Sequence, residues 1–184
     1  MGYVDGEVYY TFHAELTEED FEKMKNVKMV IFDQIFNFPI DKIPDNIISI
    51  EFCYFSHFNH PVDSLPSKLE SLTLGPCFNH PLDFLPSSLK MLKIQDGIFN
   101  YKIDNLPDNL EYLDLGINYR LPIKKFPTNL KTFKIPLSYN STLKYIPRTL
   151  EKLYVPYQFR DAKSVGGKNF GEIKNYFKNN WEFY

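Results

Sequence analysis

The chain has 184 residues, a net charge of −2 and an apolar fraction of 43%, enough for one domain with its own core. Its 13 prolines exclude a bundle of long helices, because proline interrupts the helical hydrogen-bond ladder. No stretch reaches the roughly 18 apolar residues of a membrane span, and the start lacks the features of a secretory signal. Cys53 and Cys77 are too few for a disulfide framework, so we expect a cytoplasmic protein.

Residues 1–26 are expected to form an N-terminal cap. Within it, residues 8–12 are candidates for a strand, and a helix begins at Thr17. Thr17 is suited to the N-cap and Asp20 to the matching position of a capping box. Met24 then lies on the packing side of this helix, and residues 27–32 have the composition of a first sheet strand.

A repeat follows over residues 27–156, and its clearest marker is a proline that recurs every 20–22 residues. The unit reads apolar-Pro-x-x-Leu-x-x-Leu-x-Leu, and it occurs six times in register. The marker prolines are Pro44, Pro66, Pro86, Pro107, Pro127 and Pro147. We number the six coils in this order.

A second motif lies between these markers. It reads Phe-Asn-x-Pro followed by Ile, Val or Leu at residues 36–40, 58–62 and 78–82, and it decays in the three later copies. We expect its asparagines to point inward at a turn and to pair with the next coil, because buried polar groups need partners. These are Asn37, Asn59, Asn79, Asn100 and Asn140.

The alternation Leu-x-Leu has a period of two, which predicts one short strand per coil. Successive strands then form one parallel sheet, and the rest of each unit supplies the crossover. That return path is too short for a helix with its turns. It should be extended, with a single 3₁₀ turn.

Residues 157–184 are expected to form a C-terminal helical cap. Phe170, Ile173, Phe177 and Trp181 are spaced by three and four residues, which favours a helix from Lys168 to Trp181. Residues 158–168, with two adjacent glycines, are predicted to be a loop. The alternative is that the aromatic end docks on a partner.

These motifs resemble two known repeats. Leu-x-x-Leu-x-Leu followed by an asparagine is similar to a leucine-rich repeat. Phe-Asn-x-Pro-Ile combined with the Leu-Pro-x-x-Leu-x-x-Leu-x-Leu-Gly of residues 65–75 resembles the FNIP repeat of social amoebae and giant DNA viruses. The resemblance implies a β-rich α/β solenoid. We expect a right-handed, leucine-rich-repeat-like horseshoe with one parallel sheet, an extended or 3₁₀ convex side and helical caps at both ends.

The resemblance also implies a non-catalytic scaffold for protein–protein interaction, located in the host cytoplasm if the protein is viral. Two alternatives stay open. Some viral FNIP proteins carry an F-box, which would make this chain a substrate-binding adaptor of a ubiquitin ligase, although 26 residues before the first strand are few for an F-box. The other alternative is a structural component of a viral particle that self-associates.

The residues between the inward leucines should face the concave side and contact a protein partner. The predicted face mixes aromatic and charged groups, which suit a binding surface. Its predicted residues are Glu51, Met91, Lys93, Tyr112, Asp114, Lys134, Lys152 and Tyr154. A merely solvated sheet face is the alternative.

Catalytic signatures are absent: the chain has no phosphate-binding glycine loop, no HExxH, no CxxC and no GxSxG. We therefore expect no enzyme activity, no cofactor and no metal. One cluster has the chemistry of a zinc site, because His57, His60, Cys77 and His80 fall in neighbouring columns. Ordinary positions in surface turns explain the same residues.

The charge is unevenly distributed. Residues 1–116 carry 19 acidic and 8 basic side chains, whereas residues 117–184 carry 4 and 13. We expect this split to orient a protein partner or to promote contact between ends. Scattered lysines without an RNA-binding motif argue against nucleic acid, and nothing indicates a membrane.

Overall fold

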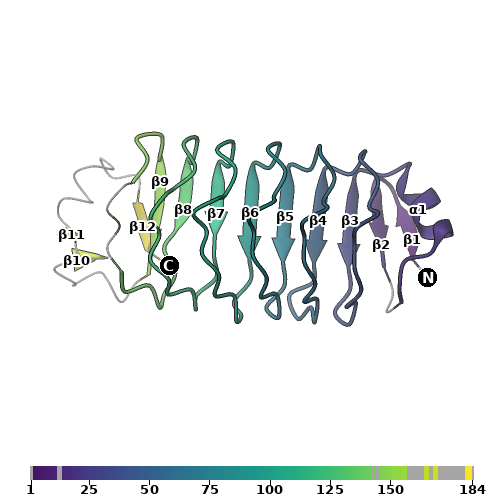
Figure 1. The fold of residues 1–184 in the computed structure, drawn as a ribbon, viewed down its shortest axis with the longest axis horizontal. Coiled ribbons are helices and arrows are strands. Elements are labelled where there is room, and N and C mark those ends of the chain that lie inside the picture. Colours follow the sequence, from purple (N-terminus) through teal and green to yellow (C-terminus); the bar gives the residue numbers. More distant parts are fainter. Residues whose placement is uncertain are drawn as a thin grey trace.

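The repeats build a single solenoid in a computed structural model, which describes residues 2–11, 14–141, 143, 146–156, 164–165, 168–169 and 181–183. Figure 1 shows the strands side by side in one row along the longest axis of the molecule. Ten of the described strands form one sheet in the order β1-β2-β3-β4-β5-β6-β7-β8-β9-β12, and β10 and β11 form a separate two-stranded sheet. The predicted solenoid with a parallel sheet is confirmed, and the horseshoe curvature stays a prediction.

Each predicted Leu-x-Leu segment is a strand. The first sheet strand of the repeat region is β3 (Met29–Phe32), and the six coils contribute β4 (Ser49–Phe52), β5 (Ser71–Leu74), β6 (Met91–Ile94), β7 (Tyr112–Asp114), β8 (Thr132–Lys134) and β9 (Lys152–Val155). Neighbours pair in parallel with equivalent residues opposite one another, as Leu72 is opposite Leu92. The register follows from the pattern, because a one-residue slip would expose every inward leucine.

The core consists of columns of equivalent residues that run along the solenoid. The motif aromatics form one column of stacked rings: Phe36, Phe58, Phe78, Phe99 and Tyr119 have successive centroid distances of 6.4, 6.3, 6.1 and 5.9 Å. All are buried, and so is Tyr139, which holds the same place in coil six. Stacked aromatic pairs add directional attraction to the burial of their area.

The return path contains a tight turn at each marker proline. In coil two, the N–H of Leu69 donates to the carbonyl of Pro66 at 3.0 Å, and the equivalent bond is present in all six coils. This is an i to i+3 hydrogen bond of a β-turn. One isolated i to i+3 turn per coil agrees with the expected single 3₁₀ turn, and no longer 3₁₀ helix is found in the described residues.

The N-terminal cap combines a hairpin and a helix. Strands β1 (Tyr3–Asp5) and β2 (Val8–Tyr10) pair antiparallel, and β2 continues the sheet parallel to β3. Helix α1 (Glu18–Met24) begins with the predicted capping box of Thr17 and Asp20. The buried Asp20 carboxylate also accepts the Tyr9 hydroxyl. Although burial opposes its charge, the hydrogen bonds from Tyr9 and Thr17 lower the pKa of Asp20 to about 2.

The C-terminal end differs from the prediction at the residues that the structure describes. Lys168–Asn169 is strand β11, paired with β10 (Ser164–Val165), and Trp181 belongs to strand β12 (Trp181–Phe183). Strand β12 pairs in parallel with β9, so a strand satisfies the edge of the last coil. The predicted helix is therefore wrong at both of its ends, and its interior, residues 170–180, lies outside the described residues. No helix in the described part of the chain is long and apolar enough to span a membrane.

Candidate protein-interaction surface

The predicted binding residues lie on one face of the sheet. Two columns alternate with the buried leucines and are aligned by the strand register. The first comprises Ser49, Ser71, Met91, Tyr112, Thr132 and Lys152, and the second Glu51, Thr73, Lys93, Asp114, Lys134 and Tyr154. Most of these side chains are half-buried, Lys93 is exposed, and Thr73 and Asp114 are buried. All eight predicted residues therefore share one continuous surface, which we call the sheet face.

The middle of the sheet face holds a partly buried ion pair. The Nζ of Lys134 lies 3.5 Å from an oxygen of Asp114, whose side chain is only 6% exposed. The other Asp114 oxygen accepts the N–H of Gly116 at 3.0 Å, and Gly116 has a φ of +70° that favours glycine. A carboxylate held from two sides is a fixed feature of this surface.

At the C-terminal end of the sheet face, a lysine is fixed between two partners. The Nζ of Lys152 lies 4.8 Å from the ring centroid of Tyr154 and 2.9 Å from the Glu182 carboxylate on β12. Hydrogen bonds to Tyr154 and Glu182 raise the pKa of Lys152 to about 12. Partial burial, with the nearby Asp114 charge and Tyr154, raises the pKa of Tyr112 above its ordinary value. Tyr112 and Tyr154 are thus half-buried aromatic side chains that lie beside charged groups held by ion pairs.

Two charged residues of the sheet face form no ion pair in the described part of the chain. Lys93 lies between Thr73 and Asp114, and Glu51 lies between Ile31 and Thr73. Because adjacent strands are about 4.8 Å apart, these opposite charges are separated by roughly two strand spacings. They are available to charges on a partner.

The sheet face extends beyond the predicted residues. Val8 and Tyr10 on β2 and Met29 and Ile31 on β3 continue the same two columns and are half-buried. They make the N-terminal end of the face apolar. The sequence contained a signal for the apolar character of this end. Residues 29–32 are all apolar, whereas in the later strands apolar residues alternate with polar ones.

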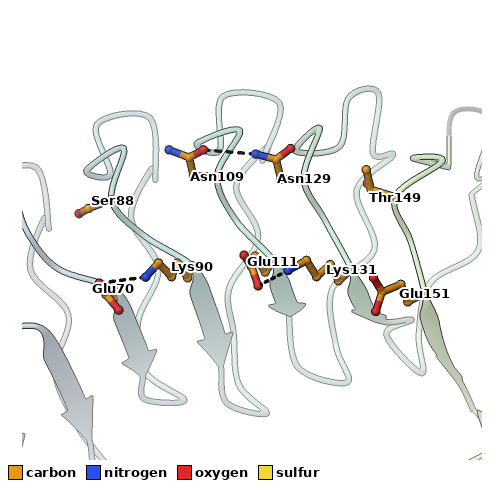
Figure 2. Close-up of a pocket in the computed structure, with 9 residues that line it drawn as sticks. All are labelled: Glu70, Ser88, Lys90, Asn109, Glu111, Asn129, Lys131, Thr149 and Glu151. Carbon is orange, nitrogen blue, oxygen red and sulfur yellow. Dashed lines mark hydrogen bonds and ion pairs between the residues drawn. The ribbon is translucent and has the colours of Figure 1, made fainter.

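A groove runs along the edge of the sheet where the strands begin. It encloses about 500 Å³ and crosses coils two to six. Figure 2 shows a row of charged side chains at the strand starts and a row of uncharged polar side chains above them. The charged row is Glu70, Lys90, Glu111, Lys131 and Glu151, and the polar row is Ser88, Asn109, Asn129 and Thr149.

The charges of this groove largely neutralise one another. Glu70 pairs with Lys90 and Glu111 with Lys131, both at 2.9 Å (Figure 2). The hydrogen bond to Glu111 also raises the pKa of Lys131. The sequence analysis did not predict this row. A signal was present, because the charge of the residue after the first leucine of the repeat unit alternates between negative and positive from coil two to coil six. These ion pairs connect neighbouring coils, so the side chains of the groove mainly stabilise the packing of the coils.

The predicted asparagines form a ladder on the surface and not in the core. The Oδ1 atoms of Asn37, Asn59 and Asn79 accept the backbone N–H of the next asparagine, Asn59, Asn79 and Asn100, at 2.9–3.0 Å. Asn79 is half-buried and the other four are exposed, so the inward orientation is wrong. The aromatic before each asparagine takes the inward direction, which turns the asparagine outward.

The zinc-like cluster does not converge. His60 and His80 each form a hydrogen bond with the asparagine carbonyl of the preceding coil, at 2.9 and 3.0 Å. No group of three or more metal-ligating side chains was found where the structure describes the chain. Cys53 and Cys77 are free thiols, and burial raises the pKa of Cys53. These residues are accounted for by turns and coil contacts.

Comparisons with known proteins agree with this architecture. A family model described as FNIP repeat matches residues 58–97 and 78–118. The crystal structure of CroV588, described as a novel circular LRR protein and originating from a giant virus, superposes with a TM-score of 0.66 and 22% identity. The match covers 91% of this chain and 30% of that one, so the chain spans under a third of that protein. No curated protein sequence matches. Residues 58–118 are FNIP repeats, and they belong to a leucine-rich-repeat-like solenoid.

Proposed function

We propose that the protein is a non-catalytic scaffold that binds a partner protein across its sheet face. The observation that supports this most is the placement of Tyr112 and Tyr154 as half-buried aromatic residues on one continuous face. Tyrosine is enriched at interaction hot spots because its ring buries much area at a small cost in conformational entropy.

The charges on this face support selective binding. The pairs Asp114–Lys134 and Lys152–Glu182 are already formed, so a partner need not neutralise them. Lys93 and Glu51 instead select a partner with one acidic and one basic group at matching positions. The apolar end of the sheet face at Met29 and Ile31 adds apolar surface for a partner to bury, and this contribution does not depend on the orientation of the partner.

The test begins with cross-linking, affinity purification and mass spectrometry to identify the partner, followed by calorimetry with the purified pair. Tyr112→Ala combined with Tyr154→Ala should weaken binding by about 2 kcal/mol or more. The control is Tyr54→Ala with Tyr101→Ala, which removes two exposed tyrosines outside the sheet face. Equal affinities for the two double variants would refute the sheet face as the binding surface.

The identity of the partner distinguishes the two alternative roles. Recovery of a cullin adaptor bound to the N-terminal cap would support the ubiquitin-ligase adaptor. Recovery of the chain itself, with a concentration-dependent increase in mass, would support the structural component of a particle. Either result would replace the general scaffold with a specific role.

A further inference from the structure

A second surface, between coils five and six, has a different chemistry from the sheet face. It is a pocket of about 420 Å³ lined by Lys124, Lys125, Phe126, Pro147 and Arg148, with two threonines. We infer that this pocket binds an acidic peptide segment of a partner protein, with an apolar side chain of that segment against Phe126 and Pro147. The inference deepens the proposed scaffold function by naming the chemistry of a bound segment.

The position of Lys124 marks a reversal of charge along one column of the solenoid. The residue after the apolar end of the second motif is acidic in coils one to four and basic in coil five: Asp41, Asp63, Asp83, Asp104 and Lys124. Between Ile117 and Leu150 the sequence has seven basic residues and no acidic one. The pocket therefore lies where the acidic surface ends.

The cations at this pocket are mostly not neutralised within the described part of the chain. Lys124 and Arg148 form no ion pair there, and Lys125 is 3.8 Å from Asp108 with both side chains more than half exposed. Two carboxylates are nearby: Asp104 accepts the backbone N–H of Lys124, and Asp108 that of Thr128. Among the described residues, Lys124 and Arg148 thus remain available to a carboxylate-bearing ligand.

The apolar lining favours a peptide over a purely ionic ligand. Phe126 is 6% exposed and packs edge to face against Phe133 at 5.2 Å, so its ring is held in place. Pro147 begins the turn of coil six and has no backbone N–H to satisfy. A site with a rigid apolar floor and a cationic rim matches an acidic segment that contains one aromatic residue.

The test uses a short fluorescein-labelled peptide of Asp and Glu residues with one central Phe, measured by fluorescence anisotropy on the full chain. The variant is Lys124→Asp with Arg148→Ser. Aspartate is the residue that four other coils carry at the first position, and serine is the residue that coils two and three carry at the second. The fold should therefore accept both changes, and circular dichroism verifies it.

The matched control is Lys42→Asp with Lys68→Ser, which alters the net charge by the same amount on coils one and two. The pocket variant should bind the peptide roughly tenfold more weakly than the wild type, and the control should bind nearly as well. Replacing the central Phe of the probe with Ser should also weaken binding several-fold. Equal losses in both variants, or no effect of the Phe replacement, would overturn the pocket.

Two further measurements separate other occupants. If single-stranded oligothymidine bound the wild type as tightly as the peptide and lost affinity with the pocket variant, the site would serve phosphate chains and the inference would fail. It would also fail if the protein alone formed a dimer, measured by sedimentation, that the pocket variant abolished. The Tyr112→Ala, Tyr154→Ala variant should bind the probe normally, so failure of the sheet face does not imply failure of the pocket.

Discussion

Tyr119 and Tyr139 stand where the first four coils place phenylalanine in the buried column. The two hydroxyl groups differ in their surroundings. The Tyr139 hydroxyl accepts the N–H of Ile123 at 3.2 Å, whereas the Tyr119 hydroxyl is buried without a hydrogen-bond partner among the described residues. Burial raises the pKa of both phenols, so each is neutral at physiological pH. The same substitution should therefore have opposite effects at these two positions.

Tyr119→Phe should increase the free energy of unfolding by about 1 kcal/mol, because it removes a buried group whose desolvation is not compensated. Tyr139→Phe should decrease it by about 1–2 kcal/mol, because it leaves the Ile123 N–H unpaired. Denaturant unfolding of the two single variants measures both. A loss of stability in Tyr119→Phe would show that its hydroxyl has a partner after all.

The repeat pattern assigns Tyr119 and Tyr139 to the phenylalanine column, but it does not show how their hydroxyl groups differ. The change from phenylalanine to tyrosine is visible in the repeat alignment, whereas the pairing of each hydroxyl depends on which backbone group lies opposite it. The same holds for the candidate site, where the sequence predicted the positions of residues but not their contacts. Tyr112 and Tyr154 were placed by the period of the strand, but the partners that hold Asp114 and Lys152 come from neighbouring coils and from β12.

At the scale of the element, the asparagine ladder connects the turns of the second motif in the first four coils. Asn59 accepts a hydrogen bond from the next coil, whereas no bond to the Oδ1 of Asn100 is found in the described part of the chain. Coil five has Arg120 in place of an asparagine. The ladder thus ends where the second motif loses its asparagine.

Asn59→Ala should lower the free energy of unfolding by about 0.5–1 kcal/mol, since the Asn79 N–H loses its acceptor at a partly hydrated surface. Asn100→Ala removes an equivalent side chain whose Oδ1 accepts no hydrogen bond from the described residues, and it should change stability by less than about 0.5 kcal/mol. Thermal unfolding of both variants makes the comparison. Similar destabilisation by the two would indicate that the side chain acts through the turn conformation and not through the ladder.

The elements differ in how far the sequence predicted them. The six repeat strands were predictable because the inward residues recur with the strand period. The C-terminal cap was not, because Trp181 fits a helical spacing but pairs with Leu153 at the edge of β9. A short spacing pattern is local, and the unsatisfied edge of a sheet is a stronger constraint.

For the molecule as a whole, the described strands touch mainly their immediate neighbours in the sheet. Stability in such a solenoid is approximately a sum of terms for each coil and each contact between coils. Damage to one coil should therefore remain local, unlike damage to the core of a globular domain.

Leu113→Ala tests this in coil four, where Leu113 is completely buried. Loss of the side chain should cost about 2–5 kcal/mol. Hydrogen exchange should increase in β6, β7 and β8, while β2, β3 and α1 keep their protection. Uniform loss of protection would show that the solenoid unfolds as one cooperative unit.

The asparagine ladder also bears on how such a chain can lengthen. Coils two and three each donate one backbone N–H to the asparagine before them and offer one Oδ1 to the asparagine after them. A tandem duplication of residues 66–85, one repeat period, would insert a segment whose two sides already match its new neighbours. The copy number of these early coils can change by gene duplication with the ladder contact kept at both junctions, whereas an insertion after coil five, which has Arg120 in place of the asparagine, would begin without that contact.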